Sequence, residues 1–465
     1  MQRDEVQVNF LSPDARSRVI EAADPDTPGT TRSRLGWRRL ALIWLVARGI
    51  VFGVWAYFGL TTQGDVLYYW QRLNLMVEGV PLSQTLVEYP TPVVWFLSVP
   101  YWLAGRSRPA FVVVFIAGML VLDMLFAVVL WRAGGKRRNF AVLFWIVFTF
   151  VMGPTTYMRF DLVPAVRGGR AVLSLLATRD SFAGALVGLG AAFKLWPAVL
   201  WPGTLGGSRR ARVRSTIGFL VVGVGLAVVS LVAGGWGRLV SPLAWQGARG
   251  LQVESIWATP LMLIRGFSPS RYTVALSQWK AFEIAGNGTA TALTASTVAT
   301  LLGYLAIAVT YVLWLRRPTR TVVEAALLMV LVVTVTIVTN KTFSPQYMMW
   351  LGGPLAGLLV AAGRAPVEPS APSWRDLRTM TWCVLGLTLV TQLVYPILYQ
   401  PLVHGGDLLL LATIVLVVRN VALVGFLVWL GLLVRRMLRS GEADGGVRND
   451  EPSDEHDEKE RKVGP

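Results

Sequence analysis

The sequence has few of the residues that build disulfides and metal sites. It contains one cysteine, Cys383, and two histidines, His404 and His456, which lie far apart in the chain. A single cysteine cannot form an intramolecular disulfide, and a structural zinc site needs several cysteine or histidine ligands. We therefore expect neither a disulfide nor a metal centre, and no nucleotide-binding motif indicates another cofactor.

Charged residues are also scarce. They make up 15% of the 465 residues, where a soluble protein would carry about 25%. Hydrophobic residues make up 54%, and they gather in runs of about 17–25, the length that crosses a hydrocarbon core of about 30 Å. Clear runs span 40–60, 111–131, 218–233, 322–339 and 408–434. Because only helices satisfy their own backbone in lipid, the sequence predicts an all-α polytopic membrane bundle of about twelve transmembrane helices.

Basic residues lie between the apolar runs. The formal net charge of +17 would suggest nucleic-acid binding in a soluble protein. Here the positive-inside rule assigns the basic clusters to the cytoplasm. These clusters lie at 38–39, 132–138, 209–214, 316–320, 364–378 and 435–439. We therefore expect no nucleic-acid partner. We expect a multi-pass plasma-membrane protein that contacts lipid and has both termini in the cytoplasm. The outer segments are then 61–109, 157–162, 235–292, 340–346 and 400–407.

Polar stretches flank the apolar region. Residues 1–36 and 437–465 are rich in charged residues and poor in apolar ones, a composition that favours disorder. We expect a disordered cytoplasmic arm at 1–36, one membrane bundle at 37–436 that carries the function, and a disordered cytoplasmic tail at 437–465.

Two apolar segments do not fit a straight span. The segment 89–104 is short and proline-rich, and we expect a helix or re-entrant piece at the outer interface, where its Tyr and Trp side chains belong. The segment 181–205 is broken at Trp196-Pro197, and we expect a hairpin of two short helices. Discontinuous helices at membrane depth commonly line a cavity. Long connections are commonly functional, so the outer segments 61–109 and 235–292 favour chemistry on the outer face.

The first outer segment holds a carboxylate beside aromatic residues. Asp65 follows the first apolar run by a few residues, next to Tyr68 and Tyr69. At the boundary between water and lipid, this carboxylate could accept the proton of a sugar hydroxyl. The alternative is an N-cap for a helix that starts near Val66.

Charged motifs also follow two later apolar runs. Arg159 and Asp161 lie in Arg159-Phe160-Asp161-Leu162-Val163-Pro164, where the guanidinium could hold a phosphate or sugar hydroxyl, or the pair could be a surface ion pair at a helix start. Lys194 ends a glycine-rich apolar run. It could bind a phosphate in a protein-lined cavity, or extend to the interface.

Two outer turns combine amide and charged groups. The stretch 249–255 is flanked by Trp245 and Trp257, whose rings could stack on sugars. An ordinary polar loop is the alternative. Lys341 lies in the polar turn 340–347, which provides either a second phosphate contact or a plain connection between helices.

These motifs occur in an order that resembles glycosyltransferase family 87, a group of class-C (GT-C) membrane glycosyltransferases. Similar members are polyprenyl-phosphate-mannose-dependent alpha-mannosyltransferases, among them the phosphatidylinositol mannoside enzyme. The resemblance runs from about residue 37 to 435. The matching stretches are Gly64-Asp65 with Tyr68-Tyr69, Glu88-Tyr89-Pro90-Thr91-Pro92, Arg159-Phe160-Asp161-Leu162-Val163-Pro164, the run from 188 to Lys194-Leu195-Trp196-Pro197, Leu251-Gln252-Val253-Glu254-Ser255, and Phe343-Ser344-Pro345-Gln346-Tyr347.

The resemblance implies a GT-C-type bundle with interfacial helices in its outer loops. It implies inverting transfer of a sugar, here mannose, from a polyprenyl-phosphate donor to a glycolipid or glycan hydroxyl at the outer face, with Asp65 as general base and no metal. The cations implied to neutralise the leaving phosphate are Arg159, Lys194, Arg249 and Lys341. The implied sugar and acceptor contacts are Tyr68, Tyr69, Glu88, Asp161, Gln252, Glu254 and Gln346.

Two other classes of function remain open at this point. A transporter or lipid-linked-sugar flippase would be expected to show an internal repeat, which the unequal outer segments do not suggest. A non-enzymatic membrane scaffold would have little use for intramembrane charges, which are costly in lipid.

Overall fold

The computed structural model describes residues 35–58, 62–135, 137–364 and 370–446. Within these residues, 7 helices are long and apolar enough to cross a membrane. They are α2 (Trp37–Phe58), α5 (Arg108–Ala133), α9 (Arg209–Ala248), α11 (Thr289–Arg316), α12 (Val322–Thr339), α14 (Trp374–Gln392) and α16 (Leu409–Gly446). The predicted all-α membrane bundle is thus confirmed, while the number of about twelve spans stays a prediction.

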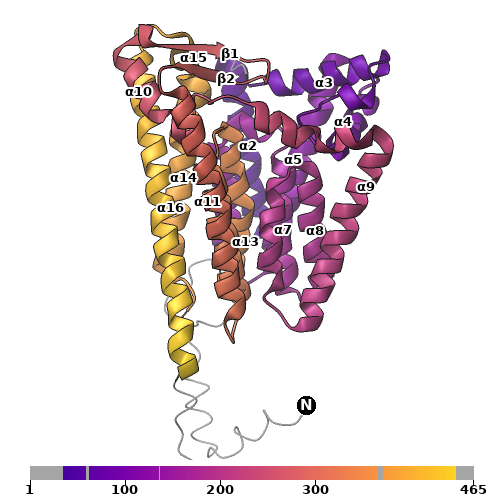
Figure 1. Ribbon diagram of the computed structural model, residues 1–465. Helices are drawn as coiled ribbons and strands as arrows, with labels where there is room; N and C mark the ends of the chain where they lie inside the picture. The colour runs from indigo at the N-terminus through magenta and orange to yellow at the C-terminus, as the bar shows by residue number, and fades with distance from the viewer. Residues whose placement is uncertain (1–34, 59–61, 136, 365–369, 447–465) are drawn as a thin grey trace, which may run out of the picture.

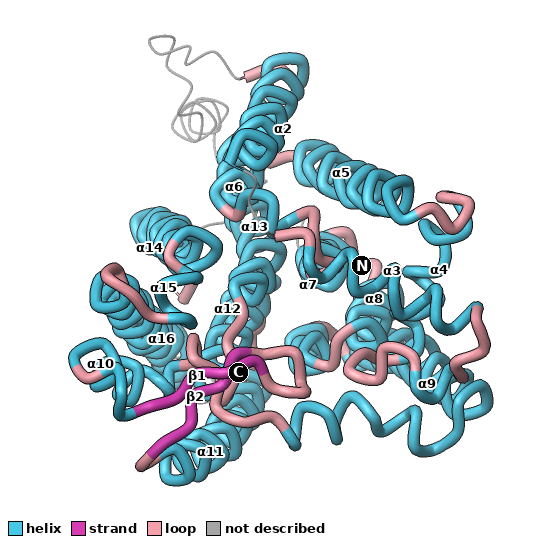
Figure 2. Tube along the Cα trace, turned by 90° about the horizontal axis from the view of Figure 1, so that it is seen from above, coloured by secondary structure: helices cyan, strands magenta, loops and turns pink. Residues whose placement is uncertain are grey.

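Shorter apolar helices lie among the long ones (Figures 1 and 2). They are α6 (Arg138–Val151), α7 (Leu162–Leu176), α8 (Asp180–Phe193) and α13 (Met349–Arg364). α7 packs against α13 and α8, and α8 packs against α9. Small residues permit this approach: a Cβ at Gly353 on α13 would lie 1.8 Å from the carbonyl oxygen of Ala165 on α7.

The break predicted within 181–205 is confirmed. α8 ends at Phe193, and the 3₁₀ helix η4 (Trp196–Leu205) begins two residues after Lys194 and packs back against α8. Pro197 has no backbone N–H and cannot continue an α-helix. The two short helices therefore place Lys194 at the joint between them.

The upper end of the bundle in Figure 1 carries most of the irregular structure. α3 (Gly64–Val77) and α4 (Thr91–Leu103) lie there, and α4 supplies the helix expected at 89–104. α9 bends at Gly235, whose φ of 74° favours glycine, and its last part runs across this end (Figure 2). α10 (Thr259–Phe267), α15 (Tyr399–His404) and an antiparallel hairpin of β1 (Tyr272–Leu276) and β2 (Phe282–Gly286) complete it.

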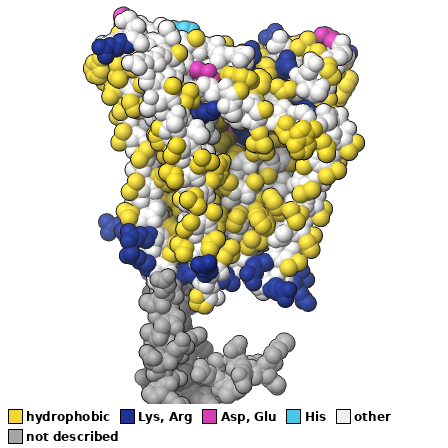
Figure 3. All heavy atoms as spheres, viewed as in Figure 1, with side chains coloured by type: hydrophobic (Ala, Val, Ile, Leu, Met, Phe, Trp, Pro, Cys, Tyr) yellow, Lys and Arg dark blue, Asp and Glu magenta, His cyan; other side chains and the backbone are white. Residues whose placement is uncertain are grey.

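Short helical turns connect these elements. They are the 3₁₀ helices η2 (Leu82–Gln84), η3 (Gly153–Thr156), η5 (Ile256–Ala258), η6 (Pro269–Arg271) and η7 (Pro345–Met348), and the π-helical turn η8 (Leu393–Ile397). Lys and Arg side chains gather at the lower end of the bundle (Figure 3). The basic clusters predicted to be cytoplasmic thus lie together at one end of the bundle.

The ends of the bundle only partly follow the predicted boundaries. α2 begins at Trp37, where the bundle was expected to start. α16, however, continues to Gly446, so the prediction of a disordered tail from residue 437 is wrong for residues 437–446. The rest of the predicted tail and residues 1–34 of the predicted arm lie outside the described residues.

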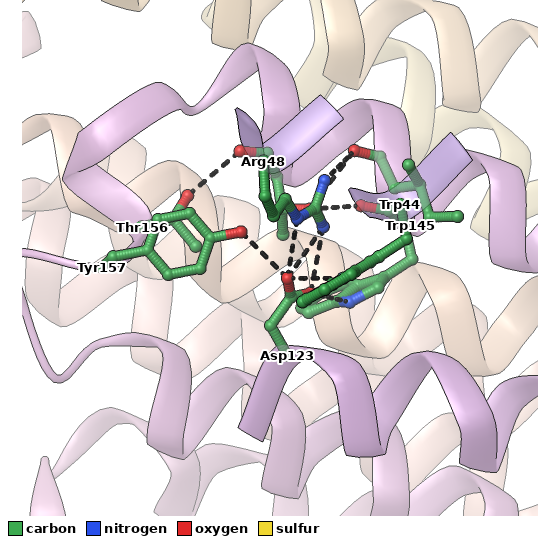
Figure 4. A network of polar contacts seen from close by, with 8 residues as sticks. Trp44, Arg48, Asp123, Trp145, Thr156 and Tyr157 are labelled. Atoms are coloured by element: carbon green, nitrogen blue, oxygen red, sulfur yellow. Dashed lines mark hydrogen bonds and ion pairs between the residues drawn. The ribbon is translucent and has the colours of Figure 1, made fainter. Parts of the chain in front are cut away.

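A buried ion pair joins α2 to α5 near the middle of both helices (Figure 4). Arg48 donates to the Asp123 carboxylate through Nε at 2.9 Å and Nη2 at 3.1 Å. The same carboxylate accepts hydrogen bonds from the indoles of Trp44 (2.8 Å) and Trp145 (2.7 Å) and the hydroxyl of Tyr157 (2.9 Å). A charge in lipid is costly unless it is paired in this way, so this network fixes how α2, α5 and α6 pack.

Candidate functional site

A cavity of about 240 Å³ lies near the upper end of the bundle. It is formed by the loop before α4, the joint between α8 and η4, the part of α9 after its bend, the helices α11 and α12, and the start of α13. Its lining residues are Glu88, Tyr89, Pro90, Lys194, Leu195, Trp196, Val199, Pro242, Leu243, Gln246, Tyr304, Thr336, Asn340, Tyr347 and Trp350. Among these, Lys194 is the only cation.

The ammonium of Lys194 is held in place by a carboxylate and by aromatic rings. Its Nζ lies 2.5 Å from Oδ1 of Asp161, which also accepts a hydrogen bond of 2.7 Å from the indole of Trp350. The Nζ lies between 5.4 and 5.6 Å from the ring centres of Phe160, Tyr347 and Trp350, a cation–π distance. These contacts hold the Lys194 side chain in one place. It is a fixed cation in a protein-lined cavity.

Stacked aromatic rings form one wall of this cavity. The rings of Trp196 and Trp350 lie 5.0 Å apart at an interplanar angle of 14°, and those of Trp350 and Tyr347 lie 4.0 Å apart at 23°. Trp196 follows the break after α8, whereas Tyr347 and Trp350 belong to η7 and α13. The stack makes this wall of the cavity aromatic and rigid.

Polar atoms without a partner lie in and near the cavity. Oε2 of Glu88 and Nε1 of Trp196 are buried, with no hydrogen-bond partner in the described part of the chain. The same holds for Oε1 of Gln346 in η7. Burial raises the pKa of the Glu88 carboxyl above its ordinary value, although its hydrogen bond with Tyr68 acts in the opposite direction. Such atoms could bind the hydroxyl groups of a ligand.

A second ion pair lies beside the first. Oδ2 of Asp65 is 2.8 Å from Nη1 of Arg159, and the Asp65 side chain is 33% exposed. Asp65 lies in the first turn of α3 and the N-cap is Gln63, so the N-cap alternative is wrong. Burial acts to lower the pKa of the Arg159 guanidinium, but nearby groups, first among them the Asp65 carboxylate, raise it above its ordinary value.

Phe160 connects the two ion pairs. Arg159 and Asp161, on either side of it, bind Asp65 and Lys194 respectively. The Phe160 ring lies 4.9 Å from that of Tyr89 and 5.8 Å from that of Tyr69. Arg159 and Asp161 are thus not the surface ion pair considered from the sequence. Asp65 and Arg159 do not line the cavity. Arg159 is next in sequence to Phe160, whose ring contacts the Lys194 ammonium.

The two polar outer turns pack against each other. Oε1 of Gln252 accepts a hydrogen bond of 2.7 Å from the backbone N–H of Phe343. Nζ of Lys341 donates to the carbonyl oxygens of Gly247 (2.8 Å) and Arg249 (2.6 Å). Gln252 is buried, and these bonds hold the turns 249–255 and 340–347 together. Lys341 and Arg249 lie outside the cavity lining, and their contact with a phosphate stays a prediction.

Glu254 is enclosed with a residue that the sequence analysis missed. Its carboxylate lies 3.3 Å from Nη1 of Arg419 on α16, and both side chains are buried. Arg419 also donates to the backbone carbonyl of Glu254 at 2.6 Å. Glu254 therefore anchors the outer loop to α16 and does not reach the cavity. An arginine inside an apolar run is costly without a partner, and that signal could have identified Arg419.

Arg238, on the bent part of α9, was also missed. It is buried, and its Nη1 donates to the carbonyl oxygen of Tyr89 at 2.9 Å. Ser241, three residues further on, donates to the carbonyl oxygen of Val87 at 2.8 Å. These bonds hold the loop that carries Glu88 against α9. A single arginine in a polar segment gives no sequence signal for such a role.

The stability of the protein should depend on pH through Glu254. Burial raises the pKa of its carboxyl from an ordinary 4.5 to about 7, against the opposing effect of Arg419. Folding then favours the protonated form, so this contribution to the free energy of unfolding is fully present below the unfolded pKa and is lost as the pH rises through about 7. We expect the thermal unfolding midpoint in detergent to fall as the pH rises from about 4.5 to about 7.

Replacing Glu254 by glutamine should flatten this part of the pH dependence, although the unpaired Arg419 lowers the midpoint overall. Glu78→Gln, at an exposed position, should leave the slope unchanged. An unaltered slope in Glu254→Gln would contradict the assignment.

Comparison with known proteins gives no relative. No family model matches the chain, and no curated protein and no solved structure matches it.

Proposed function

We propose that the protein is a membrane glycosyltransferase. In this proposal it moves a sugar, mannose in the first instance, from a polyprenyl-phosphate donor to a hydroxyl of a glycolipid or glycan. The observation that carries the proposal is a fixed cation in a polar, aromatic-lined cavity that adjoins an apolar groove. A lipid-linked phosphate sugar has the same division into an anionic, hydroxyl-rich head and a long apolar tail.

The apolar groove lies between α4, α8 and α9 and has a volume of about 250 Å³. Its lining is almost entirely apolar and includes Phe219, Val224 and Ala227. It shares Pro90, Leu195, Pro242 and Leu243 with the polar cavity. A prenyl chain in the groove would thus place its phosphate beside Lys194.

In the proposal, residues at the upper end carry out an inverting transfer. Asp65 takes the proton of the acceptor hydroxyl, whose oxygen bonds to the anomeric carbon as the bond from that carbon to the phosphate oxygen breaks. The electron pair of the broken bond leaves with the lipid phosphate. Lys194 stabilises the negative charge that develops there. Glu88 and the wall formed by Trp196 and Trp350 hold the sugar.

The charge pattern supports an orientation for this reaction. Lys and Arg gather at the end of the bundle opposite the cavity (Figure 3), and the positive-inside rule assigns such an end to the cytoplasm. In the proposal the protein is a multi-pass plasma-membrane protein with cytoplasmic termini, and transfer takes place at the outer face.

A transfer assay tests the proposal. The purified full chain is reconstituted in vesicles with radiolabelled polyprenyl-phosphate mannose and a glycolipid extract as acceptor. We expect the label to leave the polyprenyl phosphate and to appear in a glycolipid. Movement of intact labelled donor across the bilayer with no new glycolipid would support a flippase and would contradict the proposed transferase.

Lys194→Met should weaken donor binding. Loss of one charge-assisted contact to the phosphate should raise the dissociation constant for polyprenyl-phosphate mannose by about 10- to 100-fold. Lys280→Met is the matched control, because Lys280 is exposed in the turn between β1 and β2. Equal donor affinity in both variants, each with a normal unfolding midpoint, would remove Lys194 from the phosphate site.

A further inference from the structure

A second large cavity lies at the opposite, basic end of the bundle. It has a volume of about 720 Å³ and opens between the lower ends of α11, α12 and α16. Its lining residues are Thr310, Leu313, Arg316, Arg317, Pro318, Leu331, Gly431, Val434, Arg435, Leu438 and Arg439. None of these belongs to the upper site.

The rim of this cavity carries arginines without matching carboxylates. Arg316, Arg435 and Arg439 are exposed, and the described residues provide no carboxylate within ion-pair distance of them. Arg317 is buried and pairs with Glu324 through Nη1 at 2.5 Å, but its Nε has no hydrogen-bond partner in the described chain. Arg435 and Arg439 are four residues apart and therefore lie on the same face of α16. This arrangement favours a ligand with a strong negative charge.

The inner wall of the cavity is apolar. Leu313, Leu331 and Val434 line it above the arginines. Gly431 leaves space there, because a Cβ at this position would meet no atom within 4 Å. Residues beside the cavity, such as Leu432 with 46% and Val428 with 57% exposure, face outward from the bundle. The cavity thus presents a cationic rim beside an apolar, lipid-facing wall.

We propose that this cavity binds an anionic phospholipid. Its phosphate lies among Arg316, Arg435 and Arg439, and an acyl chain lies along the wall beside Gly431. Basic pockets between transmembrane helices are suited to anionic headgroups, and arginine favours phosphate because its N–H groups can bind two oxygens at once. A soluble phosphate would use the rim but not the apolar wall. The proposal does not depend on the reaction at the upper end.

Native mass spectrometry of the full chain in detergent tests this site. The probes are phosphatidylglycerol, with phosphatidylcholine for comparison. We expect phosphatidylglycerol to be retained preferentially, and the variant Arg435→Gln/Arg439→Gln to bind it about thirtyfold more weakly. Arg209→Gln/Arg210→Gln removes the same charge from exposed positions of α9 outside the cavity. That control should bind phosphatidylglycerol as the wild type does.

A second variant distinguishes binding of a lipid from binding of a free anion. Gly431→Leu fills the apolar wall without changing the charge, and we expect it to lose phosphatidylglycerol binding while the unfolding midpoint stays normal. If Gly431→Leu retains the lipid, or if both double variants lose it equally, the proposed site is wrong. Inorganic pyrophosphate that competes with phosphatidylglycerol at equal concentration would also overturn it, in favour of a soluble anion.

Discussion

Replacing Asp65 by asparagine is expected to reduce sugar transfer by about 10²- to 10⁴-fold, the contribution that a positioned general base makes. Asparagine keeps the shape of the side chain and can still accept a hydrogen bond from Arg159, but it cannot take up the acceptor proton. Donor binding should be little changed, because the phosphate lies beside Lys194. The measurement is the initial rate of label transfer in vesicles, together with the dissociation constant for polyprenyl-phosphate mannose.

Asp180→Asn provides the matched control. Asp180 also lies in the first turn of a helix, α8, but at the opposite end of that helix from Lys194. This variant should transfer sugar at the wild-type rate. Full activity in Asp65→Asn, or an equal loss in both variants, would exclude Asp65 as the base.

Asp123→Asn should be among the most destabilising single substitutions in the bundle. Asp123 is fully buried and accepts hydrogen bonds from Arg48, Trp44, Trp145 and Tyr157. Removing its charge leaves the Arg48 guanidinium uncompensated in an apolar environment, which costs about 3–5 kcal/mol. We expect a much lower unfolding midpoint in detergent and a reduced yield of folded protein.

Two further variants distinguish the effect of breaking the Arg48–Asp123 ion pair from the effect of removing any aspartate charge. Asp407→Asn changes an exposed aspartate before α16 and should leave the midpoint unchanged. Arg48→Met combined with Asp123→Asn should recover part of the stability, because it removes the unpaired charge. If Asp123→Asn alone behaves like Asp407→Asn, the network does not hold α2, α5 and α6 together.

Much of the fold follows from local features of the sequence. Apolar runs of membrane length predicted the long helices, and the proline after Trp196 predicted the break between α8 and η4. The short proline-rich segment before Arg106 became α4. The boundary at residue 437 was wrong because a change in composition does not end a helix, and α16 continues to Gly446.

The candidate site could be predicted only in part. Asp65, Arg159, Asp161 and Lys194 were selected from the sequence, but their pairing was not. Asp161 meets Trp350, 189 residues away, and such contacts depend on how helices pack rather than on local pattern. The same reason explains why Arg419, the partner of Glu254, was missed.

The most direct test of the central claim is a structure of the protein with polyprenyl-phosphate mannose bound. The proposal predicts the phosphate within hydrogen-bond distance of Nζ of Lys194, the sugar against Trp196 and Trp350, and the prenyl chain in the groove beside Leu195 and Pro242. A donor bound elsewhere, for example with its phosphate among Arg316, Arg435 and Arg439, would contradict it.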